Sequence, residues 1–135
     1  MSVQSICPKL VVEGADSALA FYCEVLGGRV GSRFEHQGRV VFADVRVGDG
    51  AVVQVKDADQ TDTPGRGVIV DVLCDDPDEV MARALASGAE EVFPVADQPY
   101  GARQGRFRDP FGHQWIVGTA ITMSHEDVQA ALGGG

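Results

Sequence analysis

Apolar and polar residues along the first half of the chain predict one helix among four strands. The strands are expected at residues 5–12, 29–36, 39–47 and 51–57. The helix is expected from about Asp16, which can cap its first turn, because apolar residues recur there at helical spacing. Gly27 and Gly28 end this helix, since glycine accepts the left-handed conformation of a C-terminal cap.

After a polar segment at 57–67, the same order of elements returns. A second helix is predicted to begin at Asp76-Pro77, with a capping carboxylate and proline at the first helical position, and to end at Gly88. Strands are expected at 68–74, 91–95, 104–109 and 113–120. Ser124 can cap a short C-terminal helix, and the Gly133–Gly135 tail is expected to fray.

The two halves align when the chain is shifted by 62 positions. With this shift, the helix and the following strand of the first half coincide with those of the second half. The hairpin turn that contains Gly50 then falls on the Asp109-Pro110-Phe111-Gly112 turn. The chain is therefore predicted to be an α+β fold in a single domain, residues 1–135. Two paired β-α-β-β-β units, at 5–57 and 68–120, would form a curved mixed sheet around a cleft, with helices on the outer face and a helix and tail at 121–135.

Composition narrows the function classes. The net charge of −9 and the lack of a basic stripe argue against a nucleic-acid partner. No apolar run reaches the length of a membrane span and no signal pattern opens the chain, so a cytoplasmic protein without a membrane partner is expected. The three cysteines form neither a CxxC pair nor an even set, which argues against a disulfide framework or zinc ribbon.

Two segments carry a family resemblance. They are Leu10–Tyr22 (LVVEGADSALAFY) and Gly105–Trp115 (GRFRDPFGHQW). With the repeated β-α-β-β-β pattern, they resemble the vicinal-oxygen-chelate superfamily, which includes glyoxalase I, bleomycin-resistance proteins and extradiol dioxygenases. The segments Tyr100–Arg103 and Ser124–Asp127 look like the PhnB-like branch of that superfamily.

The resemblance implies where a metal would be held. Metal enzymes of the superfamily place one ligand on the first and last strand of each unit, which here corresponds to Cys7, Gln54, Ile69 and Ile116. Isoleucine has no lone pair, and a thiolate with one amide suits none of the usual metals. We therefore expect the metal site to be lost and predict no metal and no cofactor.

Other polar residues are candidates for ligand binding. Strand alternation places Lys9 on the face of Cys7 and Asp71 on that of Ile69, where they would either hold a polar ligand or pair with each other. Lys56 and Gln114 share faces with Gln54 and Ile116. The complete set of predicted ligand-binding residues is Cys7, Lys9, Gln54, Lys56, Ile69, Asp71, Tyr100, Arg103, Gln114 and Ile116.

Histidine and aromatic residues are expected to be structural. His113 shares strand parity with Trp115 and is predicted to face the helices, and Trp115 is expected in the core. His36 adjoins a turn and His125 starts a helix. Cys23 and Cys74 have no histidine nearby in sequence to suggest a nucleophile.

Three hypotheses of function follow. The first is a metal-independent, glyoxalase/bleomycin-resistance-like protein that binds a small organic molecule in the cleft between units, such as an antibiotic removed by sequestration. The second is a metal-independent isomerase or lyase that uses Lys9, Asp71 or Cys7 as acid or base. The third is a regulatory or scaffold subunit with a cleft filled by side chains. The resemblance also implies a homodimer, in which units could exchange between chains.

Overall fold

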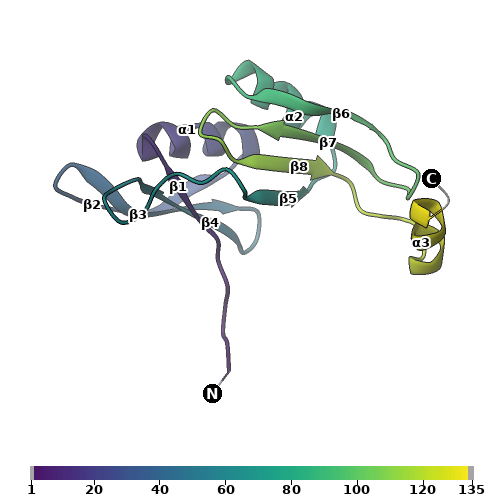
Figure 1. Ribbon diagram of the computed structural model, residues 1–135, viewed down its shortest axis with the longest axis horizontal. Helices are drawn as coiled ribbons and strands as arrows, with labels where there is room; N and C mark the ends of the chain where they lie inside the picture. Colours follow the sequence, from purple (N-terminus) through teal and green to yellow (C-terminus); the bar gives the residue numbers. More distant parts are fainter. Residues whose placement is uncertain (1, 134–135) are drawn as a thin grey trace. The chain divides into compact units, whose positions relative to one another are not determined.

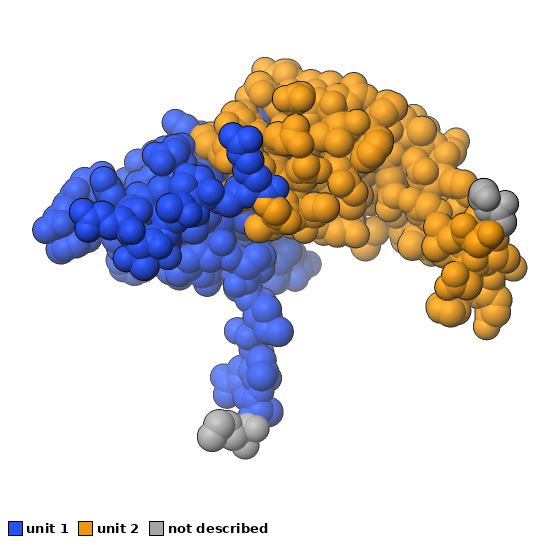
Figure 2. All heavy atoms as spheres, in the orientation of Figure 1, with its two compact units in different colours: residues 1–66 blue, residues 67–135 orange. Residues whose placement is uncertain are grey.

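The computed structural model describes residues 2–133, which run through the β-α-β-β-β order twice and end in a helix (Figure 1). Residues 1–66 and 67–135 form two compact units (Figure 2). Unit 1 contains β1 (Lys9–Val12), α1 (Ala15–Leu26), β2 (Arg29–His36), β3 (Arg39–Val47) and β4 (Ala51–Asp57). Unit 2 contains β5 (Ile69–Leu73), α2 (Pro77–Ala86), β6 (Glu90–Asp97), β7 (Arg103–Arg108), β8 (Gln114–Gly118) and α3 (His125–Gly133).

Each unit has its own four-stranded mixed sheet, so the α+β class is confirmed. The strand order is β1-β4-β3-β2 in unit 1 and β5-β8-β7-β6 in unit 2. In each sheet the first and last strands of the repeat are parallel neighbours, and the other neighbours are antiparallel.

The 62-residue offset extends to the backbone register. Lys9 is opposite Gln54 in unit 1, and Asp71 is opposite Ile116 in unit 2, so both members of the pair shift by the same offset. The β2–β3 and β6–β7 pairs depart from this rule. Arg29 pairs with Arg46, whereas the residue 62 positions later, Glu91, pairs with Phe107, a slip of one position.

One face of each sheet is packed against the helix of the same unit. The buried side of α1 meets β3 and β4, and that of α2 meets β6, β7 and β8. The fully buried side chains of this packing include Trp115, Tyr22, Phe107, Leu10, Val12, Val25, Val45, Val55 and Val117. We call the other side of each sheet its open face.

The two helices begin differently. In α2 the prediction is confirmed, because the Asp76 side chain accepts a hydrogen bond from the Glu79 amide at 3.1 Å and Pro77 is the first helical residue. In α1 the predicted cap was wrong. Gly14, with φ of 87°, precedes the helix, and the carboxylate of Asp57 on β4 accepts from the Ala15 amide at 2.7 Å.

Asp16 lies in the first turn of α1 and instead binds the guanidinium of Arg33 on β2, at 2.8 Å. A carboxylate distant in sequence therefore does the capping that a local residue was expected to do. Sequence spacing alone could not show this, since the contact depends on the strand that packs beside the helix.

Most strand boundaries agree with the pattern, and β2, β3 and β4 match it in full. The first strand is shorter than predicted. It begins at Lys9 and not at residue 5, so Cys7 precedes the strand. Ile6, which the pattern placed in the strand, is 90% exposed. The segment before Cys7 runs away from the rest of unit 1 (Figure 1).

The C-terminal helix α3 is capped as predicted, with the Ser124 hydroxyl accepting from the Asp127 amide at 3.2 Å. The predicted fraying of the glycine tail falls largely on residues 134–135, outside the described part of the chain. Within residues 2–133 no helix has the length and apolar character needed to cross a bilayer.

Candidate functional site

The β7–β8 hairpin is organised by one buried carboxylate, that of Asp109. Its Oδ1 accepts from the amides of Phe111 at 2.9 Å and His113 at 3.0 Å. Its Oδ2 accepts from the indole Nε1 of Trp115 at 2.8 Å. Gly112 closes the turn with φ of 98° and an amide that donates to the Asp109 carbonyl at 3.1 Å. The hairpin therefore has a fixed register, which decides the face on which each later side chain lies.

The helix side of this hairpin is core. Trp115 is 1% exposed and stacks on Phe107, with ring centroids 6.4 Å apart. His113 is also buried. The predictions that Trp115 packs in the core and that His113 is buried on the same side are confirmed, which removes both from the set of ligand contacts.

The alternate residues form the open face of unit 2. Asp71, Ile116 and Arg106 are opposite one another on three adjacent strands. Ile69 and Gln114 form the neighbouring row. Asp71 and Ile69 are exposed, and Ile116 and Gln114 are half-buried. Strand alternation therefore places four of the predicted ligand-binding residues on one face.

A pocket of about 410 Å³ lies on this side of unit 2. It is lined by Phe93, Pro94, Ala96, Gln98, Tyr100, Gln104, Gly105, Arg106 and Ile116. A volume of this size is within the range that holds small organic ligands, roughly 300–1,000 Å³. Of the predicted ligand-binding residues, the pocket brings together Tyr100 and Ile116.

Polar groups of the pocket are held by one another. The Tyr100 hydroxyl donates to Oε1 of Gln104. Arg106 Nη1 donates to Oε1 of Gln114 at 3.3 Å, and its guanidinium lies over the ring of Phe93, 5.4 Å from the centroid. These contacts fix the donors before any ligand arrives, which reduces the ordering cost of binding.

Arg103 points to the opposite face. It begins β7, where a loop position was expected, and its guanidinium forms two hydrogen bonds with Asp78 of α2, at 2.7 and 2.9 Å. A third contact reaches Asp97 at 3.2 Å. The hydrogen bonds with Asp78 raise the pKa of Arg103 and lower the pKa of Asp78. Arg103 thus joins strand to helix and lies apart from Ile116.

The open face of unit 1 carries the remaining candidates. Lys9 and Gln54 are opposite each other, and the Lys9 ammonium lies 5.4 Å from the centroid of the Phe42 ring. Asp44 follows in the same row, buried, and accepts from the amides of Gly31 at 3.1 Å and Ser32 at 2.9 Å. Cys7 is half-buried before β1, and its thiol donates to the Val52 carbonyl at 3.3 Å.

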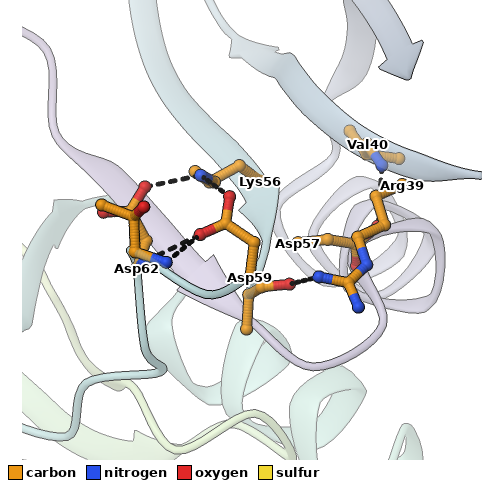
Figure 3. A network of polar contacts seen from close by, with 8 residues as sticks. Arg39, Val40, Lys56, Asp57, Asp59 and Asp62 are labelled. Atoms are coloured by element: carbon orange, nitrogen blue, oxygen red, sulfur yellow. Dashed lines mark hydrogen bonds and ion pairs between the residues drawn. The ribbon is translucent and has the colours of Figure 1, made fainter. Parts of the chain in front are cut away.

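Lys56 forms ion pairs with two aspartates of the 57–67 segment, which follows its strand. Its ammonium contacts the carboxylates of Asp59 at 2.8 Å and Asp62 at 2.5 Å (Figure 3). The Asp59 carboxylate also accepts from the amides of Thr61 and Asp62. These hydrogen bonds raise the pKa of Lys56 and hold the pKa of Asp59 well below its ordinary value. The polar 57–67 segment is therefore anchored to β4 at its start, and Lys56 is occupied by carboxylates of its own unit.

The four positions that the family resemblance assigns to metal ligands do not offer the donors that a metal needs. Ile69 and Ile116 present only hydrocarbon, while the Cys7 thiol is in a hydrogen bond with a backbone carbonyl. Within residues 2–133 no cluster of three or more His, Cys, Asp or Glu side chains could supply another site. The donor set of these positions is unsuited to Lewis-acid chemistry.

The other cysteine and histidine residues lie away from the pocket of unit 2. Burial raises the pKa of the Cys23 and Cys74 thiols, which lowers the fraction of nucleophilic thiolate at neutral pH. His36 ends β2 and His125 begins α3. No residue of this group lines the pocket of unit 2.

Seven of the nine residues that line the pocket were not predicted from the sequence, among them Phe93 and Arg106. Arg106 lies in the GRFRDPFG motif and alternates with Phe107, which the structure buries against Trp115. Its parity therefore placed it on the open face. Phe93 had no such signal, because the bulged pairing of β6 with β7 decides where its side chain lies.

Comparisons with known proteins agree with this architecture. The family model of the Glyoxalase/Bleomycin resistance protein/Dioxygenase superfamily matches residues 4–117. An uncharacterized protein of Mycobacterium tuberculosis strain H37Rv is 30% identical over 139 residues, covering 95% of this chain and 82% of the relative.

Solved structures are similar over most of the chain. TioX from Micromonospora sp. ML1 is 30% identical with a TM-score of 0.69, covering 87% of this chain and 98% of that one. A glyoxalase/bleomycin resistance protein/dioxygenase from Nocardioides is 29% identical with a TM-score of 0.64, covering 92% and 88%. The PhnB protein from Bacillus cereus, at 19% identity and a TM-score of 0.67 over 87% and 100%, shares the fold.

The repeated β-α-β-β-β units, their common register and the match over residues 4–117 lead to one conclusion. This chain belongs to the glyoxalase/bleomycin resistance protein/dioxygenase superfamily.

Proposed function

We propose that this protein binds a small organic molecule without a metal, on the open face of its sheets. The observation that carries the proposal is the pocket of unit 2, in which Ile116 occupies a metal-ligand position of the superfamily and contributes hydrocarbon to the wall. In the cleft expected from the sequence, the open faces of two units, from one chain or from two, would enclose the ligand.

Sequestration is the mode of action we favour. The superfamily description includes bleomycin resistance proteins, and binding alone is enough to remove a toxic compound. Two of the three candidate acids and bases of the enzyme hypothesis, Lys9 and Cys7, have local partners. The Lys9 ammonium lies on an aromatic ring and the Cys7 thiol donates to a carbonyl. Asp71 is exposed on β5.

Calorimetric titration with a panel of planar antibiotics tests the proposal. We expect saturable binding to the full chain, with the compound recovered unchanged after prolonged incubation. The variant Ile116→Asp should weaken binding by about tenfold or more, because a carboxylate desolvated in an apolar wall is costly. Val3→Asp, a similar change at an 80% exposed position, should leave binding unchanged.

Two outcomes would contradict the proposal. Saturable zinc or iron binding that is lost in Cys7→Ala or Gln54→Ala would restore a metal function. Conversion of a bound compound, measured by mass spectrometry, would replace sequestration with the isomerase or lyase alternative.

A further inference from the structure

The pocket of unit 2 differs in charge from the chain as a whole. The protein carries a net charge of −9, yet among the pocket's lining residues, all within the described part of unit 2, Arg106 alone is charged. The other lining groups are apolar or neutral hydrogen-bonding side chains. Overall acidity therefore does not predict the sign of the ligand, which the local groups decide.

Arg106 is held by two contacts, and one of its hydrogen-bond donors has no acceptor. Its guanidinium lies over Phe93 and one of its terminal nitrogens donates to Gln114. Its Nε is buried and has no hydrogen-bond partner among residues 2–133. A buried N–H of a charged group without an acceptor costs free energy, and an anionic acceptor regains the most because charge-assisted bonds are the strongest.

In unit 1 the charged side chain at the equivalent sheet position, Asp44, has hydrogen-bond partners within its own unit. Asp44 is 62 positions before Arg106, and the two have equivalent partners in their sheets, Gln54 and Ile116. Oδ1 of Asp44 accepts from two backbone amides and lies 3.5 Å from Nε of Arg46. Both units therefore carry a charged side chain at this position, negative in unit 1 and positive in unit 2. In unit 2 the Nε of Arg106 has no hydrogen-bond acceptor among residues 2–133.

We propose that the pocket of unit 2 takes a planar aromatic compound with a carboxylate or another acidic oxygen. The anionic group would pair with Arg106, and the aromatic body would lie against the apolar wall that includes Pro94 and Ile116. The amide nitrogen of Gln104 offers a second, neutral donor. This inference rests on the proposed ligand-binding function and names the chemical class of the ligand.

Three naphthalene compounds of equal size test the inference. Binding of 2-naphthoate, 2-naphthamide and 2-naphthylmethylamine to the full chain would be measured by calorimetry at pH 7 and low salt. We expect the anion to bind about tenfold or more tighter than the cation, as a single charged contact of this kind supports. Added salt should weaken only the binding of the anion.

Variants identify the residue responsible. Arg106→Gln should reduce naphthoate affinity by about tenfold and leave that of naphthamide nearly unchanged, and Arg106→Lys should lie between. Arg108→Gln is the matched control. Arg108 is on the same face and strand, contacts Glu90 at 3.7 Å, and is not part of the pocket. Circular dichroism and thermal melting show whether each variant is folded.

The outcomes separate this inference from the proposed function. Tighter binding of naphthylmethylamine, or equal losses in Arg106→Gln and Arg108→Gln, would overturn the acidic ligand class while ligand binding itself stands. If none of the naphthalene compounds and no antibiotic of the panel binds, both proposals fall.

Discussion

Asp109 is the residue on which the register of the β7–β8 hairpin most depends. It is 3% exposed, and its carboxylate joins two turn amides to the indole of the largest core side chain. Because these donors are buried with it, removing the carboxylate leaves them without an acceptor. Its role is to fix the strand that carries Ile116.

Asp109→Ala is therefore expected to lower the free energy of unfolding by about 3 kcal/mol, since each donor left without a partner is costly. The measurement is urea denaturation followed by Trp115 fluorescence. Asp49→Ala, at the exposed turn of the first hairpin, should change stability by less than about 0.5 kcal/mol. Equal effects of the two substitutions would show that the Asp109 network does not hold the turn.

At the scale of elements, the bulged pairing of β6 with β7 shapes the pocket. A Cβ at Gly105 would lie 2.9 Å from the amide nitrogen and 3.0 Å from the Cα of Val95. Backbone atoms cannot move aside as a side chain can, so only glycine allows the two strands this approach.

Gly105→Ala should destabilise the protein by about 2 kcal/mol, as overpacking against backbone does. It should also weaken ligand binding, because Gly105 lines the pocket. Gly67→Ala is the control, since a Cβ there meets nothing within 4 Å. Thermal melting of both variants provides the comparison, and similar melting temperatures would refute the close-approach argument.

The 57–67 segment should respond to acid. The pKa of Asp59 lies below its ordinary 3.8 because of hydrogen bonds first from Lys56 and then from the amides of Asp62 and Thr61. A lowered pKa stabilises the fold above the ordinary pKa, and this contribution is lost as the pH falls through the folded value. The raised pKa of Lys56 acts only at alkaline pH, so it adds no change in the acid range.

Asp59→Asn is expected to melt at a lower temperature than the wild type at pH 7, with the difference shrinking as the pH falls below about 4. Asp49→Asn, on an exposed turn, is the control for general charge effects. A difference in melting temperature that stays constant between pH 7 and pH 3 would mean that the negative charge of Asp59 contributes nothing to folding.

At the scale of the whole molecule, apolar side chains remain uncovered on β5. Ile69 is 50% exposed and Leu73 is 74% exposed, both on the open face of unit 2. Apolar residues grouped on one face commonly mark an association surface. We propose that a second copy of the chain covers them, in the homodimer expected from the family resemblance.

Light scattering after size exclusion should then give twice the chain mass of 14.3 kDa. Leu73→Asp should return the mass toward that of one chain, since a carboxylate in an apolar interface is costly. Leu85→Asp, on the 39% exposed flank of α2, should have no such effect. A wild-type protein that elutes with the mass of one chain would rule out the dimer.

Several features of the fold could be predicted from the sequence because they depend on local spacing. The Asp76-Pro77 helix start, the Gly112 turn and the boundaries of β2 to β4 follow from the conformations that those residues allow. The repeat of 62 positions was equally visible, and strand alternation then placed Ile69, Asp71, Gln114 and Ile116 on one face.

Other features were decided only by tertiary contacts. Asp57 caps α1 from a residue 42 positions away in sequence, and Asp78 of α2 is the carboxylate that Arg103 meets. The bulges of β6 bring Phe93 under Arg106 and so create the pocket. A sequence pattern states which face a side chain prefers but not which distant charge it meets. The family and the repeat could thus be read from the sequence, because both depend on patterns along the chain, and the pairing of each charged group was decided by the folded chain.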